Sequence, residues 1–320
     1  MIAVLASGFL TTVQDEGRRG YRAFGMPWAG AMDRYALAVA NLLAGNPPGA
    51  AVLEMTLSGG SLRFEEAAYA ALCGADMGAA LEGAPAGNWV AFPVASGATL
   101  SFGTAARGCR AYLAVLGGID APVVLGSRST YTRAGVGGFG GRALAGGDTL
   151  RIGPAPAVGR FSPRRSLPAA LVPPCGGDVR LRVLAGPQED MFASDGIATF
   201  FSSAYTVTDR NDRMGYRLEG PAIRHNGEAD IITDALAPGA VQVPGDGMPI
   251  VMMADCQTSG GYAKIGTVIG PDLRLLAQSR RGDSVHFLHC PEEEAITALR
   301  EERAAYAAIK ERFPDVGGGG

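Results

Sequence analysis

The sequence predicts a mainly β protein with a few helices, built as two β-barrel domains. Its 320 residues exceed one ordinary domain of ~150 residues. The 47 glycines and 20 prolines favour short strands and turns, because Gly costs about 1 kcal/mol and Pro about 3 kcal/mol inside a helix. Residues 147–152 and 282–287 share the pattern G-D-[TS]-[LV]-x-[IF]. This echo near the end of each half favours two domains of similar architecture.

Composition divides the chain into four segments. Residues 1–153 and 179–290 have strand and turn patterns, which predict an N-terminal and a C-terminal β-barrel domain. Residues 154–178 are rich in proline and predict a linker. Residues 291–320 open with Pro and three Glu, typical of a helix start, and end in four glycines that predict a disordered tail. Two further helices are expected, over residues 30–45 and within residues 186–207.

Charge and cysteine patterns exclude several classes of protein. A net charge of −3 and a pI near 5.7 leave no broad positive field for nucleic acid. No apolar run approaches the ~20 residues that span a bilayer, and the first residues read as a strand, not a signal peptide. The five scattered cysteines contain no C-x-x-C, and the three histidines lack metal-ligand spacing. We therefore expect a cytoplasmic protein without a metal site, a nucleic-acid partner or membrane contact.

A glycine-rich run at residues 135–140, GVGGFG, satisfies the dinucleotide pattern G-x-G-x-x-G. No buried strand leads into it and no helix follows it, so the helix dipole that such a site needs is missing. The chain also lacks G-x-x-x-x-G-K-[ST]. If ATP is used, we expect it to bind mainly on another chain.

The first candidate cluster lies within residues 11–45, where polar side chains are embedded among glycines. Gln14, Asp15, Arg18 and Asp33 occupy this segment, and glycine lets the backbone approach a ligand closely. The alternative is that Asp15 and Asp33 are turn or cap residues and Arg18 is their ion-pair partner.

The second cluster lies within residues 241–273, where the apolar run PIVMMA leads into a Gly-Gly turn. Only two lysines occur in the chain, Lys264 and Lys310, and the first is in this cluster, which favours a functional role for it. The cluster can hold a small polar, anionic substrate; its members are Asp255, Gln257, Thr258, Tyr262 and Lys264. The alternative is a tight hairpin with a solvated Lys264.

The third cluster is arginine-rich and lies within residues 209–220. Arg210, Arg213 and Arg217 offer planar guanidinium groups suited to carboxylate or phosphate. Ordinary surface charge on a strand is the alternative for this arginine-rich chain.

These three segments resemble the biotin-dependent carboxyltransferase or allophanate hydrolase subunit 2 family, which includes the C-type subunit of bacterial 5-oxoprolinase. The resemblance covers residues 1 to about 290 and rests on QDEGRRGYRAFGMPWAGAMD, DRMGYRLEG and VQVPGDGMPIVMMADCQTSGGYAKIGTVIGPDL. It implies two cyclophilin-like β-barrel domains. It also implies a heteromeric complex with a B-type subunit and a separate A-type subunit.

The resemblance implies one component of an ATP-dependent 5-oxoprolinase, in which the B-type and C-type subunits activate the lactam and the A-type subunit then opens the ring to give glutamate. One alternative within the family is a carboxyltransferase that moves a carboxyl group from carboxybiotin to urea. The chain has no biotin carboxylase region and no Met-Lys-Met site, so biotin would be carried by a separate protein. Another alternative is a regulatory protein that antagonises a kinase inhibitor.

Lactam activation needs cations to neutralise charge on oxygen, and we expect Lys264 and Arg213 to supply them. Asp255 and Gln257 would orient the substrate amide or carboxylate. The expected catalytic residues are Lys264, Asp255 and Arg213. The expected substrate-binding residues, from both halves of the chain, are Gln14, Asp15, Arg18, Asp33, Gln257, Thr258, Tyr262 and Arg217.

Overall fold

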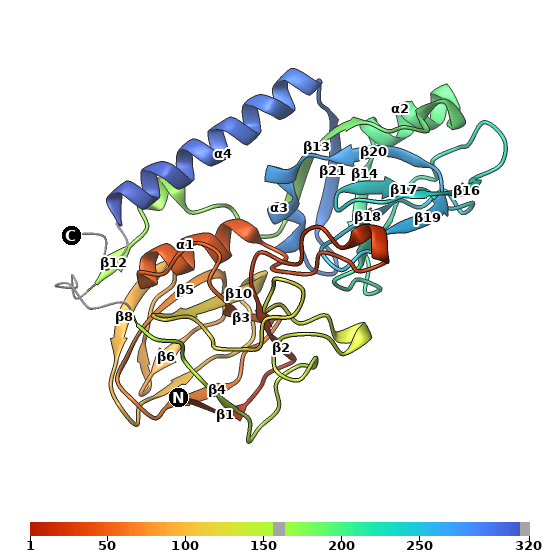
Figure 1. Cartoon of the computed structure of the whole chain (residues 1–320). Coiled ribbons are helices and arrows are strands. Elements are labelled where there is room, and N and C mark those ends of the chain that lie inside the picture. Colours follow the sequence, from red (N-terminus) through yellow and green to blue (C-terminus); the bar gives the residue numbers. More distant parts are fainter. Residues whose placement is uncertain (156–163, 314–320) are drawn as a thin grey trace. The chain divides into compact units, whose positions relative to one another are not determined.

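A computed structural model describes residues 1–155 and 164–313 of the chain (Figure 1). Strands are the main secondary structure in this part, which confirms a mainly β fold with a few helices. The chain forms two compact units. The first unit is made of Met1–Arg18, Ala29–Cys175 and Ala304–Gly320, and the second of Arg19–Trp28 and Gly176–Arg303. The segment Arg19–Trp28 thus belongs to the second unit although it lies early in the sequence.

The first unit contains two six-stranded sheets around one apolar core. In spatial order the first sheet consists of β11 (Thr149–Leu150), β1 (Ile2–Ala6), β4 (Ser61–Phe64), β9 (Thr99–Ser101), β6 (Ala80–Leu81) and β7 (Ala84–Pro85). The second consists of β12 (Arg165–Ser166), β8 (Val90–Val94), β5 (Ala68–Asp76), β10 (Arg107–Val115), β3 (Val52–Thr56) and β2 (Leu10–Gln14). Apolar side chains alternate along these strands, so each sheet turns one face to the core.

The first helix, α1 (Arg34–Ala44), is buried over nearly its whole length and lies against β5 and β10. Asp33 caps its start, because Asp33 Oδ1 accepts the Ala36 N–H at 2.9 Å. Gly45 ends it with a φ of 88°, a conformation that favours glycine. The outer side of α1 contributes to a cluster with Ile309 and Phe313 at the end of α4 (Glu292–Arg312), which explains why the helix is apolar all round.

The second unit is a closed seven-stranded barrel. Its strands in order around the barrel are β13 (Asp178–Ala185), β20 (Lys264–Val268), β17 (Ala240–Gln242), β18 (Ile250–Met252), β15 (Gly215–Glu219), β14 (Ala204–Val207) and β21 (Ser284–His289). The pair β13 and β21 is parallel, and the other pairs are antiparallel. A two-stranded ribbon of β16 (Asp230–Ala235) and β19 (Ser259–Tyr262) accompanies the barrel.

The remaining helical segments are short. The helix expected within residues 186–207 is α2 (Ser194–Ser202), which has the acidic Asp195 in its first turn; the 3-10 turn η4 (Glu189–Met191) precedes it. The others are α3 (Leu273–Ala277), η1 (Arg22–Phe24), η2 (Thr132–Ala134), η3 (Ala169–Leu171) and η5 (Gly270–Asp272).

The expected linker and tail are only partly described. Residues 156–163 of the Pro-rich segment and residues 314–320, which include the glycine tail, lie outside the described residues. Within the described part of the Pro-rich segment, β12 pairs with β8 through Arg165 and Ser166. This part of the segment therefore extends a sheet of the first unit.

Two buried tyrosines give stability predictions of opposite kind. The Tyr112 hydroxyl donates to Glu54 Oε2 at 2.8 Å and accepts the Asp33 N–H at 2.8 Å. The Tyr205 hydroxyl is buried and has no hydrogen-bond partner among the described residues, and burial raises its pKa to about 12. We expect Tyr112→Phe to lower the free energy of unfolding by about 1–3 kcal/mol, because it leaves buried polar groups without a partner.

For Tyr205→Phe we expect a free energy of unfolding equal to or above that of the wild type, since the change removes an unsatisfied buried hydroxyl. Urea unfolding followed by circular dichroism measures both variants. A loss in Tyr205→Phe as large as that in Tyr112→Phe would contradict the assignment of these hydroxyl groups.

Candidate functional site

Asp15, a candidate from the first cluster, holds a loop of the first unit in place. Its carboxylate accepts hydrogen bonds from Ser127 Oγ at 2.6 Å, Ser129 Oγ at 2.5 Å, the Arg128 N–H at 2.6 Å and the Gly17 N–H at 2.8 Å. Four donors satisfy both carboxylate oxygens of Asp15, a residue that is only 8% exposed. The geometry of Asp15 is therefore that of an anchor between the turn after β2 and residues 127–129.

Gln14 and Arg18 lie at the same loop. Gln14 Nε2 donates to Thr12 Oγ1 at 3.0 Å and to Thr130 O at 3.1 Å. Gln14 Oε1 is buried and has no partner among the described residues. Arg18 is fully buried, and its Nη2 donates to Ser129 O. The structure thus brings Gln14, Asp15 and Arg18 together around residues 127–130.

The glycine run that resembles a nucleotide motif packs against these side chains. A Cβ atom at Gly137 would collide with Arg18 Nη2, and one at Gly138 would collide with the Thr130 side chain. Both glycines have positive φ angles, of 71° and 55°. The described structure places no helix directly after the run. The close approach that these glycines permit is therefore to Arg18 and Thr130 of the same unit.

Asp33 belongs to a different set of contacts, with a buried carboxylate that sequence reasoning missed. Glu54, which is 1% exposed, accepts the Met32 N–H at 2.9 Å and the Tyr112 hydroxyl at 2.8 Å. Burial, and then the neighbouring carboxylates of Glu54 and Asp33, raise the pKa of Tyr112 well above its ordinary value. The available signal was an acidic residue in the middle of an otherwise apolar strand, β3.

In the second unit, Arg213 and Asp255 form a buried two-point ion pair. Arg213 Nε lies 3.0 Å from Asp255 Oδ2, and Nη2 lies 3.0 Å from Oδ1. The two side chains are 7% and 3% exposed. The Asp255 N–H also donates to Arg213 O at 2.8 Å. This pair from two sequence clusters fixes the chain that leaves β18 against the chain that enters β15.

Lys264 is buried and not solvated. Its Nζ lies 2.5 Å from Asp234 Oδ2 and 3.1 Å from Ala235 O, and its side chain is 5% exposed. The hydrogen bond from Lys264 lowers the pKa of Asp234. Gln188 Nε2 donates to the same Asp234 oxygen at 3.3 Å. Asp234, in the ribbon strand β16, is a partner that the sequence did not suggest, because thirty residues separate it from Lys264.

The remaining candidates present side chains to solvent. Gln257, Tyr262 and Arg217 are exposed, and Thr258 is half-buried. Gln257 and Thr258 lie between Cys256, which follows the ion-paired Asp255, and β19, so Asp255 fixes the backbone shortly before them. An amide and a hydroxyl next to each other can bind a small polar molecule through several hydrogen bonds.

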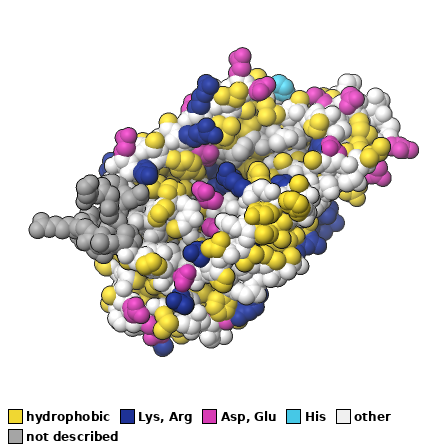
Figure 2. Space-filling model, viewed as in Figure 1, with side chains coloured by type: hydrophobic (Ala, Val, Ile, Leu, Met, Phe, Trp, Pro, Cys, Tyr) yellow, Lys and Arg dark blue, Asp and Glu magenta, His cyan; other side chains and the backbone are white. Residues whose placement is uncertain are grey.

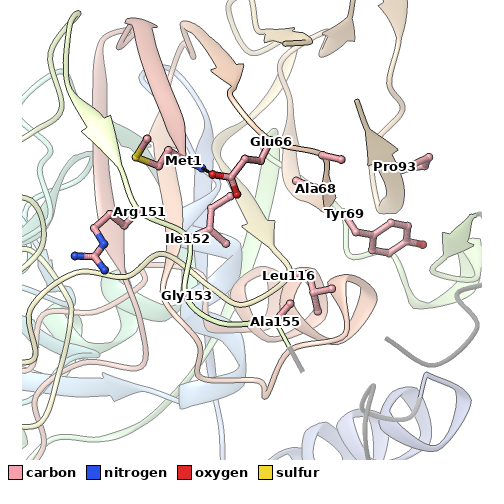
Figure 3. Close-up of a pocket in the computed structure, with 11 residues that line it drawn as sticks. Met1, Glu66, Ala68, Tyr69, Pro93, Leu116, Arg151, Ile152, Gly153 and Ala155 are labelled. Atoms are coloured by element: carbon pink, nitrogen blue, oxygen red, sulfur yellow. Dashed lines mark ion pairs between the residues drawn. The ribbon is translucent and has the colours of Figure 1, made fainter. Parts of the chain in front are cut away.

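The first unit contains a sizeable cavity. Figure 3 shows this cavity, of about 660 Å³, in the first unit. Its lining includes Glu66, Tyr69 and Arg151 together with the N-terminal Met1, whose amino group lies 3.6 Å from Glu66 Oε1. None of the candidate residues from the sequence lines this cavity.

The surface and the described residues give three further results. On the face drawn in Figure 2, acidic and basic side chains are interspersed. Within residues 1–155 and 164–313, no group of three or more His, Cys, Asp and Glu side chains is arranged to hold a metal ion. In the same ranges, no helix has the length and hydrophobicity needed to cross a membrane.

The cap at Asp33 gives a prediction that separates hydrogen bonding from charge. We expect Asp33→Ala to lower the free energy of unfolding by about 1 kcal/mol, because the Ala36 N–H loses its acceptor. Asp33→Asn keeps an acceptor oxygen, and we expect it to stay within about 0.5 kcal/mol of the wild type. Urea unfolding measures both variants. Equal losses would mean that the charge of Asp33, and not its capping bond, is what stabilises α1.

Comparison with known proteins agrees with the fold and the motifs. The family model described as "Carboxyltransferase domain, subdomain A and B" matches residues 24–289. The C-type subunit of 5-oxoprolinase from Escherichia coli (strain K12) is 38% identical over 313 residues, which are 98% of this chain and 99% of that protein.

Longer proteins are similar as well. A putative urea carboxylase of Emericella nidulans is 34% identical over 94% of this chain, which spans 25% of that protein. The crystal structure of Kluyveromyces lactis urea carboxylase superposes with a TM-score of 0.91 and 31% identity over 97% of this chain and 29% of its own. The family suggested by the sequence motifs is thereby confirmed: this chain belongs to the carboxyltransferase domain family, subdomain A and B.

Proposed function

We propose that this chain is the C-type subunit of an ATP-dependent 5-oxoprolinase, which activates a lactam and opens it to glutamate together with A- and B-type subunits. The observation that carries the proposal is the end-to-end match with the C-type subunit of the Escherichia coli 5-oxoprolinase. The urea carboxylase relatives support a second candidate function, transfer of a carboxyl group from carboxybiotin to urea. In that case biotin is carried by a separate protein.

An unactivated lactam is a poor electrophile, and its activation places negative charge on the amide oxygen. A cation in a site shielded from water stabilises that charge. Lys264 is a buried ammonium whose partner, Asp234, is 49% exposed. We therefore propose that Asp234 holds the Lys264 ammonium in position. When substrate binds, a substrate oxygen replaces Asp234 as the partner of that ammonium. Arg213 and Asp255, which neutralise each other, are proposed to act as a pair at the base of the substrate-binding loop.

The amide and hydroxyl groups nearby suit an amide substrate. We propose that Gln257, Thr258 and Tyr262 bind its polar atoms. A role of Gln14 of the first unit in substrate binding stays a prediction. Roles of Asp15, Arg18, Asp33 and Arg217 in substrate binding stay predictions.

ATP does not fit the one glycine-rich loop that resembles a nucleotide motif. Arg18 and Thr130 occupy the space beside the glycines at 137 and 138, and the described residues directly after the loop form no helix. We propose that ATP binds with the B-type subunit. The contribution of this chain is then to bind and orient the lactam and to stabilise its charge.

The chemistry gives a prediction for the two lysines of the chain. In a complex co-purified with the A- and B-type subunits, we expect ATP hydrolysis that depends on 5-oxoproline. Lys264→Ala should lower kcat/KM for 5-oxoproline on the order of 100-fold, the effect of removing one charge-stabilising group. Lys310→Ala, at an exposed position of α4, should leave it unchanged. Steady-state kinetics and a melting temperature for each variant make the comparison.

Full turnover in the Lys264→Ala complex would overturn the role given to Lys264. ATP consumption that requires urea and a biotinylated protein would establish the carboxyltransferase instead. A stable complex that consumes no ATP with either substrate would indicate a regulatory binding protein.

A further inference from the structure

The ribbon of β16 and β19 ends at a place where two backbone acceptors come together. Ala235 pairs with Ser259, and the Leu236 N–H donates to Thr258 O at 2.9 Å. The next carbonyl groups, Leu236 O and Gln257 O, both accept hydrogen bonds from one side chain. The ribbon has ended at this point, so among the described residues no backbone N–H of a paired strand donates to Leu236 O or Gln257 O. A side-chain donor satisfies both oxygens instead.

That donor is Arg22, from the segment Arg19–Trp28 of the second unit. Arg22 Nη2 donates to Leu236 O and, at 3.1 Å, to Gln257 O. Arg22 Nη1 lies 4.0 Å from Cys256 Sγ. The guanidinium carbon lies 5.7 Å from the centre of the Trp28 ring, which holds the planar group from one face. Arg22 is therefore fixed by contacts on its edge and on its face.

With Arg22 included, every residue of the loop 255–258 makes a hydrogen bond or ion pair to another segment of the second unit. Asp255 is held by Arg213, Cys256 and Gln257 by Arg22, and Thr258 O by the Leu236 N–H. The Gln257 side chain is nevertheless exposed. The backbone of the loop is rigidly held while its amide side chain remains available to a ligand. This combination is what a substrate-binding loop needs, because pre-organisation lowers the entropy lost on binding.

We propose that Arg22 is a positioning residue, which holds the loop 255–258 so that Gln257 and Thr258 meet the substrate in the correct orientation. The inference rests on the proposed function for its substrate but not for the contact itself. Lysine is a poor replacement, because an ammonium group lacks the planar fork that reaches both carbonyls and stacks on Trp28.

Hydrogen–deuterium exchange tests the contact independently of any activity. In Arg22→Gln we expect amides of residues 236 and 256–259 to exchange about tenfold faster, because the loop opens more often without its charged donor. Amides of β13 and β21 should be unchanged. Arg22→Lys should give an intermediate rate and also serves if Arg22→Gln does not fold. Arg19→Gln, an exposed arginine of the same segment, is the matched control and should exchange as the wild type does. Unchanged exchange in the loop would overturn the proposal.

Kinetics of the co-purified complex test the consequence for substrate. We expect Arg22→Gln to raise KM for the substrate about tenfold with a smaller change in kcat, Arg22→Lys to restore part of it, and Arg19→Gln to have no effect. Faster exchange with unchanged KM would overturn the positioning role. If the wild-type complex turns over neither 5-oxoproline nor urea, the proposed function fails. The exchange experiment then still supports or overturns the proposal that Arg22 holds the loop 255–258 in place.

Discussion

Burying an ionised side chain is costly unless a partner or several hydrogen bonds compensate it, and this constraint shapes both units. Asp15 is compensated by two serine hydroxyls and two backbone N–H groups. Asp255 is compensated by the two-point contact with Arg213, and Lys264 by Asp234. In each case at least one partner comes from another segment of the chain, so satisfying the charge also fixes how two segments lie against each other.

The same constraint separates the candidate residues into two kinds. Those that are buried have their charges engaged within the fold, and removing one partner would leave the other charge buried and uncompensated. Among the exposed candidates, Gln257 and Tyr262 are neutral and Arg217 is charged, and all three carry polar atoms that solvent or a ligand can reach. Asp234 is intermediate, being half-exposed while its lysine partner is buried.

Sequence reasoning could predict the features that depend on local pattern. The β class, the helix that Asp33 begins and Gly45 ends, and the cap role considered for Asp33 all follow from residue types over short distances. It could not find the partners Asp234 and Glu54, because strand register and barrel closure decide which distant residues meet. For Lys264 the sequence left open a functional and a solvated position. The observed burial beside Asp234 differs from the solvated position, and it requires the ribbon to be in place.

The segment that carries Arg22 begins a few residues after Asp15 in the sequence, so Asp15 helps to fix the position of its first end. Its ends are held close together in the first unit, because the Ala31 N–H donates to Asp15 O at 2.9 Å and Gly30 approaches Gly17 too closely for a Cβ. Gly30 has a φ of 85°, which a side chain would strain further. The residues between these ends therefore leave and re-enter the first unit at one point, as in an Ω-loop. Asp15 thus helps to hold the two ends of this segment together, and Arg22 lies on the segment between them.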